Sequence, residues 1–312
     1  MNPAVVAAII AAGVSVLTLI GTLTAQYYGR RATSKELDRT LAEQRTRTLN
    51  ERFATAADRL GSDKPPAVRV AGVYAMAGLA DEWEENRQTC VEVLCGYLRM
   101  PYEPDPGDKA SEPERLAFRT SFEVRRTVIR VITAHLRDHA PKSWQGLNFD
   151  FTGAVFDGGD FSFCEFSGGT VSYWHAEFPG GLVILFDGAN FSGGEVDFTG
   201  AKFSGGEVSF DGAKFSGGTV LFDGAQFSAG AVHFRDVRED GADLGGAEFS
   251  GGEVSFRGAE FSGGEVSFDR AQFSGGTVDF SDADDWSFPP SFPWTDTPPP
   301  GVKLPKEDQS PT

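Results

Sequence analysis

Few residues of this chain have the type and spacing that metal or nucleophilic chemistry requires. His135 and His139 are four residues apart with Asp138 beside them, and two histidines at that spacing on a helix can share a zinc ion. No third ligand follows nearby, and no glutamate stands directly after the first histidine as in metalloproteases. Because a cation near a helix C-terminus is favoured by the helix dipole, we interpret the pair as capping or solvated residues and predict no metal site. His175 and His233 are expected at solvent-facing positions.

The chain has three cysteines, Cys90, Cys95 and Cys164, and the first two are predicted to be core thiols. Their odd number and irregular spacing do not suit a disulfide framework, which favours a reducing compartment.

Other catalytic signatures are missing from the sequence. The FSGG runs are not followed by the GK[ST] of a phosphate-binding loop, and the sequence shows no Ser-His-Asp order. Carboxylates are numerous in the second half, but exposed acids lack the buried cleft that tunes one of them for acid-base work. We therefore predict a protein that is not an enzyme and holds no cofactor. A deep pocket between the helical region and the repeats would be needed for the enzymatic alternative.

The net charge of −17 is concentrated in residues 146–283, which hold 22 acidic and 6 basic residues. Such a surface argues against direct binding to nucleic acid or anionic lipid and favours a basic protein partner. The alternative is that the acids only keep a glycine-rich, rigid object soluble.

Residues 3–25 contain no charged residue. As a helix they would extend about 35 Å, enough to cross a hydrocarbon core of about 30 Å. Arg30, Arg31 and Lys35 follow the run rather than precede it, which indicates a single-pass membrane anchor with the bulk of the chain in the cytoplasm. Ala7, Ala11 and Ser15 are small residues spaced by four, a spacing that would allow two such helices to pack as a homodimer.

The segment that follows is predicted to be helical. Residues 34–61 form one long helix with Leu37, Leu41 and Leu49 near one face, and Gly61 ends it. Two apolar helices follow, the second stopped by Pro101, and a last helix runs from about 113 to 139. The segments AVRVAGVYAMAGLA and EVRRTVIRVI resemble units of the HEAT and armadillo kind.

From residue 147 onward, aromatic rings recur with a period that neither a helix nor a simple strand explains. Rings at first come every five residues and later alternate steps of seven and five, with one step of ten from Phe234 to Leu244. Two residues before each ring on a five-residue step stands a small residue, and a valine precedes most rings on a seven-residue step. Equivalent rings one coil apart would stack at about 4.8 Å, so the rhythm predicts a β-solenoid with an aromatic interior and acidic ladders outside.

The pattern A-x-F-S-G, with GADLGG at residues 241–246 as its plainest instance, resembles the pentapeptide-repeat family, whose units follow A-(D/N)-L-x-x. The resemblance implies a right-handed quadrilateral β-helix with one unit per side and four units per coil. Two departures are evident here: phenylalanine replaces leucine at the central position, and a Gly-Gly pair lengthens every second unit. The regular stretch should then have coils of 24 residues, and about 23 sides predict nearly six coils.

Four regions are therefore expected: a transmembrane anchor with its basic flank (1–32), a helical domain (33–145), the solenoid (146–285), and an aromatic cap with a disordered Pro-rich tail (286–312). The helical domain should cover the first coil, and Trp286, Phe288, Phe292 and Trp294 the last. The preferred function is a membrane-anchored interaction scaffold. The family resemblance implies an alternative, in which the acidic rod mimics duplex DNA and modulates DNA gyrase or another nucleic-acid-binding protein.

Overall fold

The computed structural model describes residues 3–61, 63–107, 109–215, 219–236, 238–239, 241–261 and 265–305. The chain divides into two compact units, residues 1–54 and 55–312. Each unit is described by itself.

Helix α1 (Pro3–Leu60) is continuous, so the uncharged run and the predicted helix 34–61 belong to one element. Leu37 and Leu41 are exposed and Leu49 is buried, so the apolar face expected along the helix is realised only toward its C-terminal end. Among the residues that were described, no helix combines the length and the apolar character that crossing a bilayer needs. The side chains of Ala7, Ala11 and Ser15 lie outside the described part of the chain.

The second unit begins with the end of α1 and three further helices, α2 (Pro66–Glu82), α3 (Arg87–Arg99) and α4 (Glu112–Leu136), with a 3-10 turn η1 (Glu84–Asn86) between α2 and α3. α4 starts with a capping box in which the Ser111 backbone N–H donates to Glu114 Oε2 at 2.7 Å. Val73, Leu94 and Ile132, one from each helix, are fully buried, and the three helices pack on one another around such residues.

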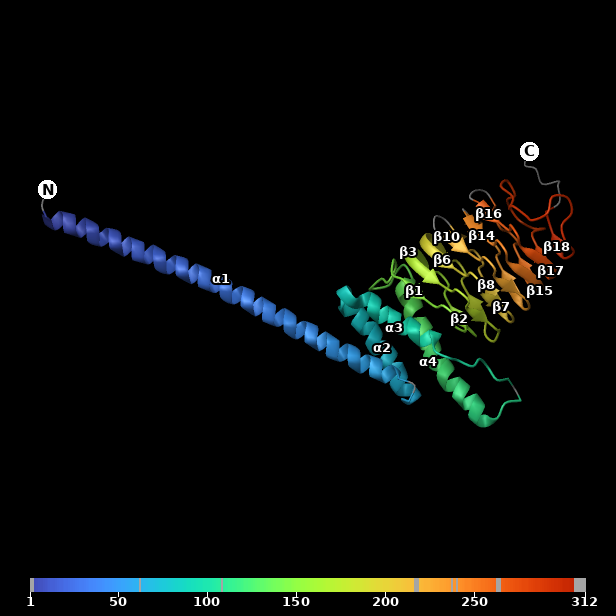
Figure 1. The fold of residues 1–312 in the computed structure, drawn as a ribbon, viewed down its shortest axis with the longest axis horizontal. Helices are drawn as coiled ribbons and strands as arrows, with labels where there is room; N and C mark the ends of the chain where they lie inside the picture. The colour runs from blue at the N-terminus through green and yellow to red at the C-terminus, as the bar shows by residue number, and fades with distance from the viewer. Residues whose placement is uncertain are drawn as a thin grey trace. The chain divides into compact units, whose positions relative to one another are not determined.

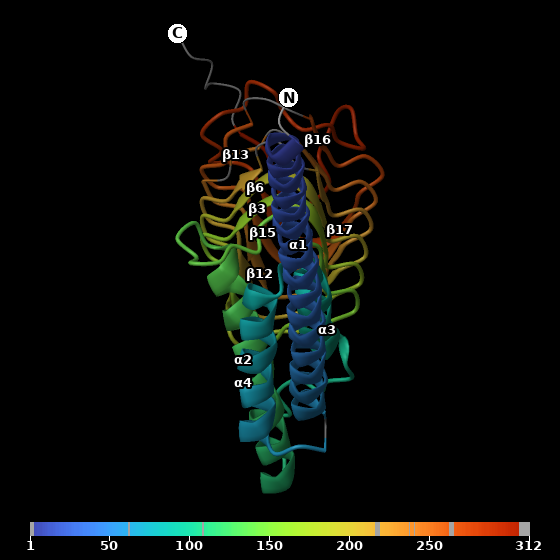
Figure 2. The ribbon, with the colours of Figure 1, turned by 90° about the vertical axis from the view of Figure 1, so that its left-hand side faces the viewer.

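The repeats form a solenoid of about six turns, whose strands lie in two parallel sheets (Figures 1 and 2). One sheet contains β1 (Phe149–Asp150), β3 (Glu165–Ser172), β6 (Asn190–Asp197), β9 (Lys214–Phe215), β10 (Thr219–Leu221), β13 (Arg238–Glu239), β14 (Gly241–Asp243) and β16 (Glu265–Ser267). The other contains β2 (Gly159–Asp160), β4 (Glu177–Phe178), β5 (Ile184–Leu185), β7 (Lys202–Phe203), β8 (Glu207–Ser209), β11 (Gln226–Phe227), β12 (Ala231–His233), β15 (Glu248–Ser255), β17 (Gln272–Asp279) and β18 (Val302–Lys303).

The rings point inward and stack coil upon coil, as the ring spacing predicts. In one column Phe178, Phe203 and Phe227 are nearly parallel, with ring centroids 4.7 and 4.8 Å apart. In another, Phe186, Phe210 and Phe234 are 4.8 and 4.9 Å apart. All of these rings are at most 2 % exposed, and the small residues or valines that precede them are buried as well. The core therefore consists of four columns of stacked aromatic rings, one column for each side of the solenoid.

The strand register gives the length of each coil. Phe203 pairs with Phe227 and Phe249 with Phe273, which are steps of the expected 24 residues. The coil between Phe227 and Phe249 has 22 residues, because the step of ten omits a Gly-Gly pair. No side is lost there, since β13 pairs with β9 and places Glu239 opposite Phe215.

The Gly-Gly pairs allow backbones of successive coils to approach closely. The second glycine of most pairs has positive φ, for example 76° at Gly194 and 75° at Gly276. A Cβ on Gly276 would lie 2.7 Å from the Gly251 carbonyl carbon, and a Cβ on Gly194 would collide with the Gly169 carbonyl oxygen. Both the backbone conformation and the space therefore require glycine at these positions.

Both ends of the solenoid are covered. α3 contacts β1 and α4 contacts β2 at the first coil. At the other end Trp286 packs edge-on against Phe261 at 5.1 Å, and Phe292 stacks on Phe268 at 5.3 Å. The expected disorder beyond residue 294 is wrong for β18, which pairs with β17 and whose Lys303 Nζ lies 2.7 Å from Asp279 Oδ2. Residues 306–312 lie outside the described residues.

Candidate interaction surfaces

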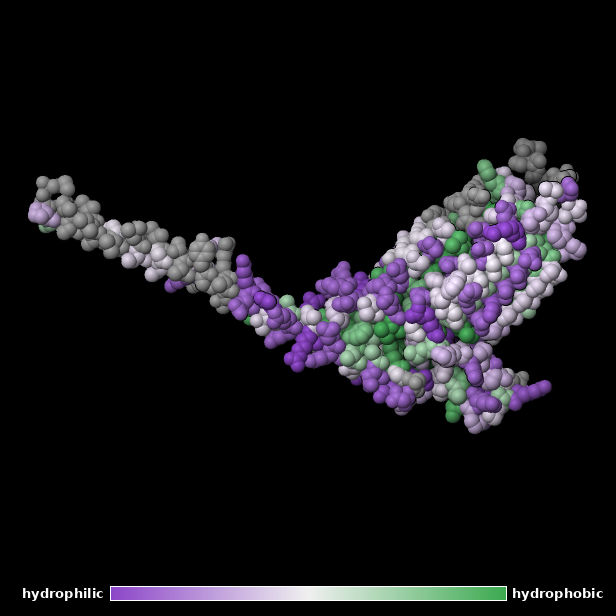
Figure 3. All heavy atoms as spheres, viewed as in Figure 1, coloured by the Kyte–Doolittle hydropathy of each residue, from purple (hydrophilic) through white to green (hydrophobic). Residues whose placement is uncertain are grey.

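The outward positions of the solenoid form columns that run across the coils. On the side made by β5, β8, β12, β15 and β17, the position before the buried aliphatic residue is occupied in turn by Val183, Glu207, Ala231, Glu253 and Thr277. Acids therefore occur on every second coil of this column rather than on each one. In Figure 3 hydrophilic and pale residues run in bands across the visible face of the solenoid.

On the side made by β4, β7, β11, β15 and β17, the paired positions are in turn Glu177, Lys202, Gln226, Glu248 and Gln272. On the side made by β3, β6, β9 and β13, they are Glu165, Asn190, Lys214 and Arg238. Lys202 Nζ lies 2.9 Å from Glu177 Oε1 on the preceding coil, and Asn190 Nδ2 donates to Glu165 Oε2 at 2.9 Å. Like charges directly opposite on paired strands are destabilising, and the pairing of Glu177 with Lys202 avoids them, whereas the register of β9 and β13 pairs Lys214 with Arg238. The expectation of acidic ladders is therefore wrong for these sides, although the acidic excess of the whole surface stands.

The two histidines of the repeats occupy different environments. His175 is exposed at a corner, with φ of 52°, and its Nδ1 lies 3.2 Å from the Gly200 carbonyl oxygen. His233 is only 8 % exposed, so its predicted solvent-facing position is wrong. It lies in β12 between Ser209 and Ser255, and its Nε2 is 3.8 Å from Glu207 Oε1. Neighbouring coils cover the imidazole because they are only one strand spacing away.

The pair His135 and His139 does not share a helix face. α4 ends at Leu136, three residues before the predicted end, and His139 is exposed beyond it. The His135 Nδ1–H donates to the Val131 carbonyl oxygen at 2.6 Å, and Nε2 lies 3.3 Å from Asp81 Oδ2. Trp144 stacks on the imidazole at 3.9 Å and donates its indole N–H to Asp81 Oδ1 at 3.0 Å. Both ring nitrogens of His135 thus face protein oxygens and are not available to a metal ion.

Cys90 and Cys95 are buried free thiols, as predicted, and Cys164 is a buried free thiol as well. Burial raises the pKa of Cys95 and of Cys164 to about 12 and that of Cys90 to about 11. Nucleophilic chemistry requires a thiolate, so these thiols behave as small apolar groups. Across the described ranges, no group of three histidine, cysteine or acidic residues is arranged to hold a metal ion.

A buried polar cluster joins the helices to the first coil, and sequence reasoning missed it. Arg125 on α4 is 5 % exposed and donates to the Leu98 and Val155 carbonyl oxygens at 2.8 and 2.6 Å. Its guanidinium carbon lies 4.2 Å from the centre of the Tyr102 ring, and the Tyr102 hydroxyl donates to Asp157 Oδ2 at 2.6 Å. Burial raises the pKa of Asp157 above its ordinary value. The sequence signal that could have indicated this cluster is Arg125 itself, a charged residue within the otherwise apolar run of α4.

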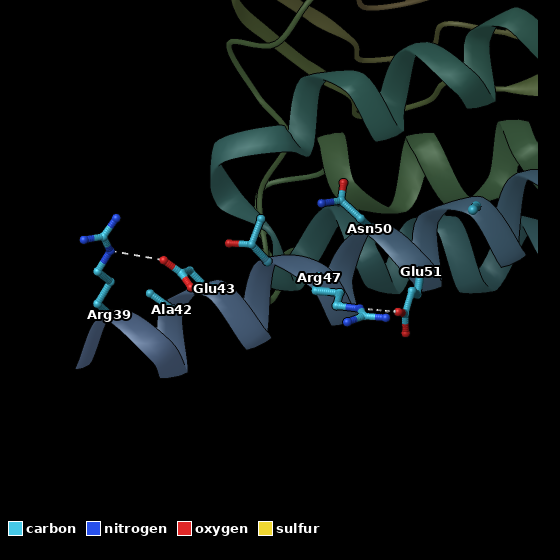
Figure 4. A pocket seen from close by; sticks show the side chains of 8 residues that line it. Arg39, Ala42, Glu43, Arg47, Asn50 and Glu51 are labelled. Atoms are coloured by element: carbon cyan, nitrogen blue, oxygen red, sulfur yellow. Dashed lines mark hydrogen bonds and ion pairs between the residues drawn. The ribbon is translucent and has the colours of Figure 1, made fainter. Parts of the chain in front are cut away.

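A shallow hollow lies along residues 39–54 of α1 (Figure 4). Arg39 Nε lies 3.1 Å from Glu43 Oε1 and Arg47 Nε lies 3.0 Å from Glu51 Oε1, each pair one helical turn apart. Such exposed pairs contribute about 0.3 to 0.5 kcal/mol each to the helix. The lining residues therefore contribute to the stability of the helix.

Stacked parallel coils with one inward ring per side and glycine-dependent corners define a β-solenoid built from five-residue units. The family model for pentapeptide repeats (9 copies) matches residues 239–284. Residues 239–284 of the solenoid therefore match the pentapeptide-repeat family, in agreement with the resemblance of the sequence pattern. Comparison with curated proteins gives no match for the chain.

Proposed function

We propose that this protein is a non-enzymatic interaction scaffold whose solenoid presents an acidic surface to a basic protein partner. The observation that carries the proposal is the exterior of the solenoid. Residues 146–283 hold 22 acidic and 6 basic residues, and the packed aromatic core keeps their coils in place. Because the coils cannot slide, outward charges keep fixed spacings, and a partner with complementary charges meets a preorganised surface.

Glu207 and Glu253 offer a direct test of the acidic surface. Both are exposed and lie two coils apart on one side of the solenoid. Affinity capture from the native cell with the full-length protein, at low and at high salt, should recover a partner whose retention falls with salt. The variant Glu207→Gln/Glu253→Gln should retain less of it, and a control change of a turn residue, Ser281→Ala, should retain the wild-type amount. Absence of any partner at both salt concentrations would count against the scaffold.

We further propose that residues 1–32 anchor the scaffold to a membrane, with the bulk of the chain in the cytoplasm. The support is the uncharged run 3–25 and the basic residues that follow it. Deletion of residues 1–32 should move the protein from the membrane fraction to the soluble fraction after alkaline extraction. Recovery of the full-length protein in the soluble fraction would retire the anchor and leave the scaffold untouched.

The alternative is a DNA mimic that modulates gyrase, and the charge spacing favours the scaffold over it. Duplex DNA carries a negative charge at every step along each strand. Here Lys202 stands between Glu177 and Gln226 on one side of the solenoid, and Glu165 is followed by Asn190, Lys214 and Arg238 on another. A supercoiling assay separates the two functions: inhibition or protection of gyrase at micromolar protein would support mimicry, and no effect would remove it.

A further inference from the structure

A groove of about 320 Å³ lies between α4 and the first two coils of the solenoid. Phe122, Arg126, Ile129 and Arg130 of α4 line one wall, and Leu182, Val183 and Leu185 line the other. Both walls belong to the second compact unit, in which α4 contacts β2 (Figure 1). The groove is therefore formed by elements that pack directly on each other.

The solenoid wall of the groove breaks the rule that outward positions are polar. Leu185 pairs with Ser209, and Val183 stands where the next coils of the same column carry Glu207 and Ala231. Leu182 and Val183 are 56 % and 42 % exposed. Solvent-exposed apolar side chains grouped at one place on an otherwise mostly polar exterior indicate a surface that a binding partner covers.

The helical wall is basic, in a chain whose net charge is −17. Arg130 donates to the Tyr74 hydroxyl at 2.8 Å, while Arg137 donates to the Ser162 carbonyl oxygen and to Asp160 Oδ2 at 3.0 and 2.9 Å. Arg126 and Arg130 are exposed, and within the described ranges neither has a carboxylate partner. One helical turn separates them, so their guanidinium groups can bind two acidic groups about 6 Å apart.

We propose that this groove binds an acidic segment of a protein partner that carries leucine or phenylalanine side chains. The exposed aliphatic wall favours apolar side chains, and Arg126 and Arg130, which have no carboxylate partner within the described ranges, favour carboxylates beside them. A polypeptide supplies both at suitable spacing, whereas a fatty acid has a single carboxylate and a flat membrane cannot enter the groove. The site goes beyond the acidic scaffold surface because it selects the opposite charge and uses none of the same residues.

The groove also differs from a catalytic pocket. Its lining contains no histidine, cysteine or serine. Its one carboxylate is Asp160. Partial burial raises the pKa of that carboxyl, but hydrogen bonds from Ser162 and the contact with Arg137 outweigh it, so the net shift is downward. The arrangement therefore suits binding.

Fluorescence anisotropy with synthetic peptides tests the proposal on the full-length protein. The probes are fluorescein-labelled twelve-residue peptides with four glutamates and two leucines, the leucines set one to four residues apart. At least one spacing should bind, and raising the salt should weaken it. Replacing its glutamates with lysine or its leucines with serine should reduce the affinity at least tenfold.

Two groove variants and two controls locate the binding. Arg126→Glu/Arg130→Glu should lower the peptide affinity at least tenfold. Val183→Glu should lower it several-fold, because it places in the groove the glutamate that the next coil carries at the equivalent position 207. Lys142→Glu, a charge reversal of an exposed residue outside the groove, and Glu207→Gln/Glu253→Gln should leave the affinity unchanged.

Three outcomes would overturn the inference: no binding at any spacing, equal binding by Arg126→Glu/Arg130→Glu, or binding of phosphatidylglycerol vesicles through these arginines without binding of any peptide. Far-UV circular dichroism and the melting temperature identify any variant that fails to fold, and Val183→Glu then remains as the independent test. Loss of groove binding would not affect salt-dependent capture by Glu207 and Glu253, so the two proposals can fail separately.

Discussion

At the scale of single residues, the positions that depart from the repeat pattern are the most informative. Tyr173 occupies a ring position between Phe151 and Phe198, with centroids 5.1 and 4.6 Å away. It is fully buried, and its hydroxyl has no hydrogen-bond partner among the described residues. A buried hydroxyl without a partner destabilises the folded state.

We expect Tyr173→Phe to raise the free energy of unfolding by about 1 kcal/mol, because it removes that hydroxyl and keeps the ring. Urea denaturation of the full-length protein measures the change. The matched control is Tyr97→Phe, since the Tyr97 hydroxyl accepts from Arg69 Nη1 at 3.1 Å and its loss should lower stability. A Tyr173→Phe protein less stable than the wild type would show that the hydroxyl is satisfied.

The raised pKa of Asp157, which lies between the helices and the first coil, makes the stability of the folded state depend on pH with a known sign. Burial is the largest cause of its raised pKa, so the folded state binds this proton more tightly than the unfolded state does. The group therefore favours folding below its unfolded pKa of about 3.8, and that advantage is lost as pH rises through the folded-state value.

Relative to Asp157→Asn, the wild type should lose stability as the pH rises from about 3.8 toward neutral, because only the wild type acquires a buried charge there. Denaturation of both proteins across this range isolates Asp157 from the other carboxylates. An unchanged difference between the two proteins, or one that grows in favour of the wild type, would contradict the raised pKa.

At the scale of elements, the Gly-Gly pairs determine how closely two coils approach. Gly194 and Gly224 both have positive φ, 76° and 62°, but only Gly194 would bring a Cβ against the backbone of the preceding coil. Nothing lies within 4 Å of a Cβ on Gly224. The two glycines therefore separate the cost of the backbone conformation from the cost of the contact.

Gly224→Ala should cost about 1 to 2 kcal/mol, the penalty of a left-handed backbone conformation. Gly194→Ala should cost about 1 to 3 kcal/mol more, because the strands must also move apart. The midpoints of urea denaturation compare the two directly. Equal losses would mean that the stacked backbones can separate at no cost.

At the scale of the whole molecule, a solenoid is stable only if the edges of its end coils are covered. α3 and α4 cover the first coil, while Trp286, Phe292 and β18 cover the last one. The cap at the second end is short, and it is made of aromatic rings and one added strand.

Truncation after Asp284 should lower the melting temperature and cause concentration-dependent association, because the edge of β17 and the rings of Phe268 and Phe273 become exposed. Light scattering during a thermal ramp measures both effects. Lys303→Ala, which removes only the ion pair with Asp279, is the control and should remain monodisperse. A monodisperse truncated protein would show that β17 protects its own edge.

The sequence by itself determined the solenoid, its 24-residue coil and the inward rings. Each coil contacts only its neighbours, so the main contacts of the solenoid join equivalent residues of successive repeats, such as Phe203 and Phe227. The period of the sequence is therefore enough to predict them. Only the tertiary structure decided which residues of different coils or helices meet. Lys202 beside Glu177, the buried His233 and the cluster of Arg125, Tyr102 and Asp157 bring together residues more than 20 positions apart. The same holds for the groove beside α4 and for β18, because a local pattern fixes the face of a strand but not the element that packs against it.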